Sequence, residues 1–254
     1  MANSPIALKP GPMLSPAKRT SNQANGTAGR GGDSRRRFLS HHVPLGVSSA
    51  VVIVLFTGLS PFSGGRLSMA QFVAATGYVA LALLATTLLI GPLNLLLRRR
   101  NPVSSYLRRD LGAWTAFASI VHTVLGFQIH GSGGFFSFID FFVANGRLLT
   151  NSFGLGNWTG LAALVLVVGL LAISSDRSIS ELKARRWKSL QRLTYALFAM
   201  VVLHAFFYGA LLRMNSPLTL ALIFTVLAVL LGQVLGMWLW RRRHSRAVTQ
   251  PARP

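Results

Sequence analysis

The chain has 254 residues, of which 51% are hydrophobic and only 12% are charged, and its formal net charge is +21. This apolar composition excludes an ordinary soluble domain and indicates a membrane protein. The absence of cysteine excludes disulfides, thiolate-held iron–sulfur clusters, covalently attached haem and a catalytic thiol, and the sequence contains no recognisable nucleotide-binding motif.

Six apolar segments predict membrane-spanning helices, because about 20 residues rising 1.5 Å each cross roughly 30 Å of hydrocarbon. The sequence therefore predicts an all-α, polytopic membrane helical bundle with about six transmembrane helices. The predicted spans are residues 43–59, 70–97, 111–129, 157–175, 190–212 and 217–240.

A membrane domain is expected at residues 41–242, with a basic tail before it and another after it in the sequence. Residues 1–40 combine Pro, Gly, Ser and Asn with few large apolar side chains, which predicts disorder, and residues 243–254 form the second tail. The sequence SRRRFLS at 34–40 is similar to a twin-arginine export signal. Alternatively, its arginines hold the inner end of the first helix against anionic lipid, which we favour because five further spans follow.

Most positive charges fall on one side of the predicted membrane topology. If the loops between the six spans alternate between sides, 23 of the 26 Lys and Arg residues share a side with both termini. Only Arg66, Arg147 and Arg213 fall on the other side. The positive-inside rule then places both termini in the cytoplasm and the chain in the cell inner membrane. The basic excess serves topology, so no nucleic-acid partner is predicted.

The acidic residues are expected outside the hydrocarbon region. Four fall on the cytoplasmic side (Asp33, Asp110, Asp176 and Glu181), and Asp140 falls in an outer loop. The sequence therefore predicts no buried carboxylate, which argues against an ion-coupled transporter.

Two histidines lie deep inside predicted spans, where polar side chains are costly and usually mark function. His122 follows Arg109 by 13 residues, and His204 follows Lys188 by 16. At 1.5 Å per residue they lie roughly 20 and 24 Å from the cytoplasmic ends of two spans that both run outward. Two imidazoles at one depth could bind a haem iron from opposite sides. The alternative is that each only forms hydrogen bonds between helices.

The segments that carry these histidines, RRDLGAWTAFASIVH (108–122) and RRWKSLQRLTYALFAMVVLH (185–204), resemble the ferric-reductase-like transmembrane domain superfamily, which includes MsrQ-like and NADPH oxidase membrane domains. The resemblance covers about residues 70–212. It implies haem b held by histidines on these two helices, with His122 and His204 at ligand positions. It also implies electron transfer across or within the membrane to a separate acceptor, with no nucleotide-binding domain on this chain.

Gln191 departs from the superfamily pattern, which usually has a histidine at this position. An amide is a poorer iron ligand than imidazole, and the 13-residue offset from His204 is about 20 Å of helix rise, so Gln191 and His204 cannot bind one iron. We therefore predict one haem, on the outer side. The sequence gives no support for a second, inner haem. A quinone or a separate protein is the expected redox partner. A flavin or quinone bound noncovalently between helices stays open as a further cofactor, because such a site has no short sequence signature.

Two other residues are candidates on the outer side. His130 follows His122 by eight residues, about 12 Å further along the helix, so we expect it near the outer mouth and not on the same iron. Arg213 is a candidate partner for haem propionates, because a guanidinium suits carboxylates, or it anchors the helix at the interface. Residues 133–149 predict a short amphipathic helix in the outer headgroup region. Pro92 is expected to free a carbonyl, and Asn94 either is its partner or only caps the inner loop.

Two functions stay open on this reading. The chain is either a haem b membrane subunit for electron transfer, belonging to an oxidoreductase, or a non-redox membrane scaffold whose buried histidines are structural. The haem content of the purified protein distinguishes them.

Overall fold

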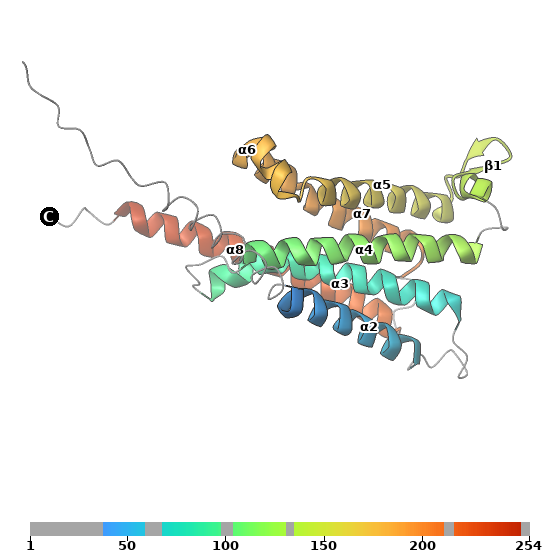
Figure 1. Ribbon diagram of the computed structural model, residues 1–254, viewed down its shortest axis with the longest axis horizontal. Coiled ribbons are helices and arrows are strands. Elements are labelled where there is room, and N and C mark those ends of the chain that lie inside the picture. The colour runs from blue at the N-terminus through green and yellow to red at the C-terminus, as the bar shows by residue number, and fades with distance from the viewer. Residues whose placement is uncertain (1–37, 59–67, 98–103, 131–134, 211–215, 250–254) are drawn as a thin grey trace, which may run out of the picture. The chain divides into compact units, whose positions relative to one another are not determined.

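The computed structural model describes residues 38–58, 68–97, 104–130, 135–210 and 216–249. Most of the predicted N-terminal tail and of the SRRRFLS segment lies outside the described residues. Helices make up most of the described chain, which confirms the predicted all-α class (Figure 1). The helices are η1 (Phe38–His42, a π-helix), α2 (Val43–Gly58), α3 (Met69–Leu96), α4 (Ser104–His130), α5 (Ser152–Ala172), α6 (Asp176–Gln191), α7 (Leu193–Phe207) and α8 (Pro217–Thr249).

Five of the described helical stretches are long and apolar enough to cross a membrane. They are Met69–Leu96, Leu107–Ile129, Ser152–Ala172, Arg185–Phe207 and Leu218–Arg243, and they coincide with the second to sixth predicted spans. The first predicted span forms α2, an apolar helix of only 16 residues, or about 24 Å at 1.5 Å per residue. The chain is therefore a multi-pass membrane protein.

Helix starts follow from local capping. Ser68 and Gln71 form a capping box at the start of α3, in which the Ser68 hydroxyl accepts from the Gln71 amide at 3.3 Å and the Gln71 side chain accepts from the Ser68 amide at 3.0 Å. The Asn151 side chain caps α5 by accepting from the Gly154 amide at 2.8 Å. These caps satisfy backbone donors that would otherwise lack a partner at the ends of apolar helices.

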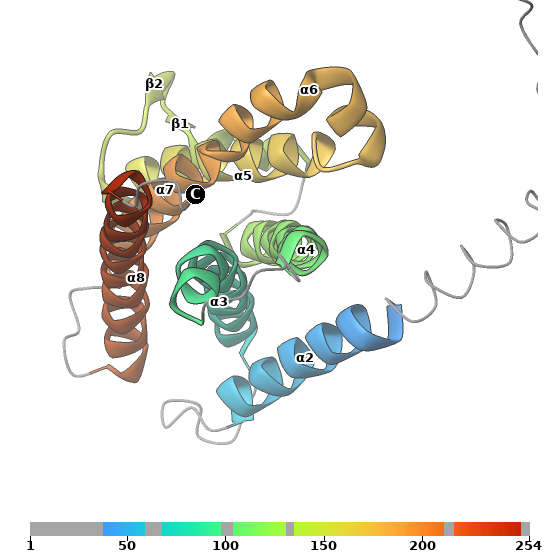
Figure 2. The same ribbon diagram turned by 90° about the vertical axis from the view of Figure 1, so that its left-hand side faces the viewer.

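Residues Leu45–Pro254 form one compact unit in which α3 is central. Helix α3 contacts α4, α7 and α8, and α5 contacts α7. The end-on view in Figure 2 shows α3 between α4 and α8. One buried cluster joins α3, α4, α5, α7 and α8. A second joins α3 to α4, and Leu45 and Ile53 of α2 pack against it.

Pro92 lies inside α3 and changes how this helix binds α8. A proline has no amide hydrogen, so the Leu88 carbonyl one turn earlier loses its intrahelical donor. The Gln233 side-chain amide of α8 donates to that carbonyl at 2.9 Å. The prediction of Asn94 as the partner is therefore wrong, because the donor comes from the neighbouring helix.

Two glycines of α8 permit this close approach to α3. A Cβ at Gly232 would lie 2.5 Å from Leu89 Cδ2, and a Cβ at Gly236 would lie 3.2 Å from Pro92 Cγ. Glycines four residues apart lie on one face of a helix and let a neighbouring backbone come close. The α3–α8 interface therefore depends on small residues in α8.

The connection between α4 and α5 differs in part from the amphipathic helix predicted for residues 133–149. A 3-10 helix, η2 (Phe135–Phe141), is followed by a two-stranded hairpin of β1 (Val143–Ala144) and β2 (Arg147–Leu148). Asn145 and Gly146 connect the strands with φ values of 53° and 72°. A two-residue hairpin turn with positive φ at both residues favours Asn-Gly. This preference explains why a hairpin forms where the predicted helix would have continued.

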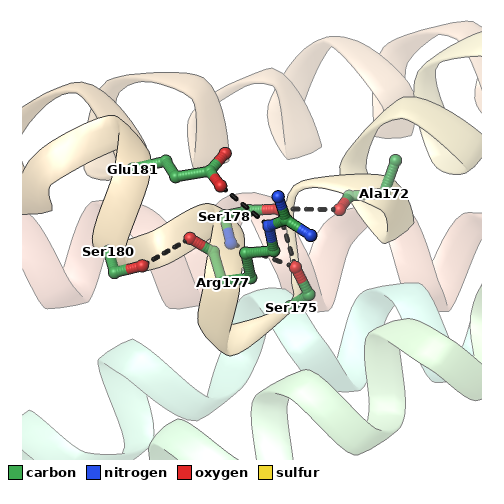
Figure 3. A network of polar contacts seen from close by, with 6 residues as sticks. All are labelled: Ala172, Ser175, Arg177, Ser178, Ser180 and Glu181. Carbon is green, nitrogen blue, oxygen red and sulfur yellow. Dashed lines mark hydrogen bonds and ion pairs between the residues drawn. The ribbon is translucent and has the colours of Figure 1, made fainter.

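The turn from α5 into α6 is built from short polar contacts, shown in Figure 3. The Ser175 hydroxyl caps α6 by accepting from the Ser178 amide at 3.1 Å, and the Ser178 hydroxyl donates to the Ala172 carbonyl at 3.2 Å. Arg177 and Glu181 form an exposed ion pair of 2.8 Å. Lys183, with φ 57°, breaks α6 into two helical pieces. The chain thereby turns from α5 back toward α7.

Asp110 is a second correction to the sequence-based picture. Its side chain is only 2% exposed, so the prediction that no carboxylate is buried is wrong. The reason is the start of α4, which lies at Ser104 and not at residue 111. Helix packing therefore surrounds Asp110 where a loop was expected.

Candidate functional site

His122 and His204 face each other inside the bundle. His122 belongs to α4 and His204 to α7. Their ring centroids are 6.0 Å apart, and their planes form an angle of 84°. The structure thus brings together the two histidines that their matching depth singled out in the sequence.

Each imidazole is held by a backbone carbonyl of a neighbouring helix. His122 Nδ1 donates to the Val73 carbonyl of α3 at 2.8 Å, and His204 Nδ1 donates to the Gly156 carbonyl of α5 at 2.8 Å. A carbonyl oxygen can only accept, so Nδ1 carries the proton in both rings. In a neutral imidazole this leaves the Nε2 lone pair available for a metal ion.

The distance between the rings suits two ligands of one metal ion. Imidazole–metal bonds are about 2.0–2.1 Å long, so two rings bound on opposite sides of one ion have centroids about 6–6.5 Å apart. The observed 6.0 Å agrees with this value.

The pair has no third protein ligand beside it. Within the described residues, no group of three or more His, Cys, Asp or Glu side chains could hold a metal ion. A bare ion would need such a group, because protein metal sites usually have three or four protein ligands. A pair of imidazoles without a third protein ligand among the described residues would instead suit a metal held in a macrocycle, such as haem.

A chain of contacts leads from His204 to η2. The Tyr208 ring lies 4.9 Å from the His204 ring, and the Tyr208 hydroxyl donates to the Asn157 side chain at 2.5 Å. The buried Asn157 amide then donates to the Phe141 carbonyl at 2.9 Å. Sequence reasoning missed both residues, although Tyr208 follows His204 by four residues and so lies on the same helix face.

The other predicted site residues lie apart from this pair or outside the described chain. His130 is the last residue of α4, about two helical turns beyond His122. Gln191 ends α6, is partly buried, and its backbone carbonyl accepts from the Thr194 hydroxyl at 2.7 Å. Arg213 lies outside the described residues.

Comparison with known proteins gives one family and several similar proteins. The sequence model of the family described as ferric reductase like transmembrane component matches residues 76–202. The protein-methionine-sulfoxide reductase heme-binding subunit MsrQ of Ralstonia nicotianae is 28% identical over 180 residues, which are 71% of this chain and 76% of that protein.

Two further proteins of the same description are similar to the chain. The MsrQ of Polaromonas naphthalenivorans is 27% identical over 68% of this chain and 73% of that protein. The MsrQ of Bordetella pertussis is 38% identical over a shorter stretch of 87 residues, 34% of this chain and 40% of that protein.

Proposed function

The chain belongs to the ferric-reductase-like transmembrane family, whose sequence model matches half of its residues, and on this premise we propose that it is a membrane haem b subunit that carries electrons to a separate acceptor. The proposed haem domain spans residues 41–242. Haem supplies one-electron chemistry at its iron when bound. The names of the similar proteins, each a heme-binding subunit of a protein-methionine-sulfoxide reductase, support the same reading.

His122 and His204 are the proposed axial ligands. The observation that carries this assignment is the facing pair of rings, 6.0 Å apart, with both Nδ1 atoms bonded to carbonyls. These hydrogen bonds fix the tautomer and orientation of both rings before any cofactor binds. Both Nε2 atoms are then free for iron.

Ligation by two imidazoles favours electron transfer over catalysis at the iron. If His122 and His204 together held the haem, the iron would supply electron transfer and would not bind a substrate. The chemistry of the acceptor must then take place on another protein. We infer that this acceptor is a reductase subunit on the outer side of the membrane, since the histidine pair belongs to the outer halves of α4 and α7.

The proposed donor is a quinone or a separate protein, and the proposed stoichiometry is one haem. The chain carries no nucleotide-binding motif, so a nicotinamide donor would need a domain on another chain. Gln191 occupies the position where the superfamily resemblance implies an inner histidine, which argues against a second haem. A flavin or quinone bound noncovalently between helices is the alternative cofactor.

We also propose an inner-membrane location with both termini in the cytoplasm. The positive-inside rule supports this orientation, because 23 of 26 Lys and Arg residues lie on the side of the termini in the predicted topology.

Haem content tests the proposed function directly. The purified protein should show the reduced-minus-oxidised spectrum of haem b and one haem per chain by the pyridine haemochromogen assay. His122→Ala and His204→Ala should each lower haem content by about tenfold or more, because each removes a ligand. A folded but colourless wild-type protein would contradict the proposal and favour a scaffold whose histidines are structural.

A further inference from the structure

We propose that two equivalent Thr–Gly motifs, Thr76–Gly77 in α3 and Thr159–Gly160 in α5, position the two histidines and tune them as ligands. This inference rests on the proposed haem function. It concerns residues that touch the histidines and not the cofactor, so they are positioning residues.

The α3 motif holds His122 through one carbonyl. The Val73 carbonyl accepts both the His122 Nδ1–H at 2.8 Å and the Thr76 hydroxyl at 2.9 Å. Gly77 lies directly beside the ring, where an added Cβ would be 2.9 Å from His122 Cε1 and 3.0 Å from Nδ1. A side chain at residue 77 would therefore displace the imidazole from its carbonyl.

The α5 motif repeats the same arrangement for His204. The Gly156 carbonyl accepts the His204 Nδ1–H at 2.8 Å and the Thr159 hydroxyl at 2.9 Å. An added Cβ at Gly160 would lie 2.7 Å from His204 Nδ1 and 2.9 Å from Cε1. Contacts below 3.0 Å cannot persist, so the ring or the helix would have to move.

The two motifs share one spacing and one physical cause. In each, the carbonyl residue is followed by threonine at the third position and by glycine at the fourth. A helix carbonyl already accepts the amide of the fourth residue along, so an incoming imidazole must approach beside that residue. Only glycine leaves room there. Glycine is otherwise unfavourable in a helix interior, so its presence at both positions needs a reason of this kind.

The threonine hydroxyl competes with the imidazole for the same oxygen. Each hydroxyl also contacts the carbonyl one residue earlier, that of Phe72 or of Leu155. Removing the hydroxyl should leave the shared carbonyl to the imidazole and strengthen the Nδ1–H bond. A stronger bond makes the imidazole a more basic ligand, which favours the oxidised metal.

Alanine substitutions at the motif glycines form the main test. Gly77→Ala and Gly160→Ala should lower haem content or leave a haem with a higher midpoint potential, because the Nδ1–H bond is weakened. Gly126→Ala in α4 and Gly169→Ala in α5 are matched controls, since nothing lies within 4 Å of either added Cβ. Wild-type haem content and potential in all four variants would overturn the inference.

Threonine-to-valine variants decide the matter if the alanine variants fail to fold. Thr76→Val and Thr159→Val keep the side-chain volume and should lower the midpoint potential. The control is Thr86→Val in α3, whose hydroxyl donates to the Ala82 carbonyl at 2.7 Å and not to a carbonyl that holds His122 or His204, so the potential should stay unchanged. If all three valine variants have the same midpoint potential, this inference is overturned while the proposed haem function stands. If the wild-type protein contains no haem, the proposed function itself is contradicted.

Discussion

At the scale of residues, the orientation of two imidazoles is the central feature. His122 and His204 each use Nδ1 for a carbonyl, so in the neutral rings Nε2 carries the lone pair. The sequence predicted the pair because helix rise converts residue offsets into depth. It could not predict Val73 or Gly156 as partners, because those contacts depend on which helices become neighbours.

Two single substitutions separate the ligands from the other candidate residues. Gln191→Ala and His130→Ala should keep the wild-type haem content and spectrum, because neither residue belongs to the facing pair. Absorbance spectra and haem-to-protein ratios of the purified variants provide the measurement. Loss of about half the haem in Gln191→Ala would instead indicate a second, inner haem.

At the scale of elements, the helices follow from apolar length, but their local deviations depend on tertiary contacts. Pro92 signalled a freed carbonyl in the sequence, yet its partner Gln233 lies 145 positions away from Leu88 along the chain. The β1–β2 hairpin could have been predicted, because Asn145–Gly146 is a strong hairpin signal. The run of phenylalanines before it led to the prediction of a helix instead. A local sequence signal such as Pro92 can therefore be interpreted fully only once the neighbouring helix is known.

The Gln233–Leu88 hydrogen bond predicts that the effect of substituting Gln233 depends on whether residue 92 is proline. Gln233→Leu should destabilise the bundle by about 1 kcal/mol, because the Leu88 carbonyl loses its donor within the membrane. In a Pro92→Ala background this cost should fall but not reach zero. Residue 92 then has an amide hydrogen for the Leu88 carbonyl, whereas the Tyr195 hydroxyl, which donates to the Gln233 side chain at 3.1 Å, still loses its acceptor. Unfolding free energies of the four proteins in a double-mutant cycle give the coupling. An equal cost in both backgrounds would refute the explanation.

At the scale of the whole molecule, composition and charge predicted a multi-pass membrane protein, and the helices confirm it. Five of the predicted spans became long apolar helices because their runs of Leu, Ala and Val exceed the hydrocarbon thickness. The start of α4 was predicted too late in the chain, since the charged pair Arg108 and Arg109 suggested a loop that the structure shows as helix. This error also hid the burial of Asp110.

Orientation can be tested with single cysteines, because the natural chain has none to give background labelling. Ala144→Cys in the outer hairpin and Ser180→Cys in α6 place thiols at exposed positions. In spheroplasts, a membrane-impermeant maleimide should label residue 144 at once and residue 180 only after permeabilisation. The reverse pattern would invert the topology and place the histidine pair in the inner half of the membrane.

Electron paramagnetic resonance of the oxidised protein tests the central claim most directly. Two imidazoles on one ferric haem with planes 84° apart should produce a low-spin, strongly anisotropic signal, because nearly perpendicular ligand planes leave the iron orbitals almost equal in energy. That signal should vanish in His122→Ala and in His204→Ala. A high-spin signal in the wild-type protein, or a low-spin signal that survives either substitution, would contradict ligation by this pair.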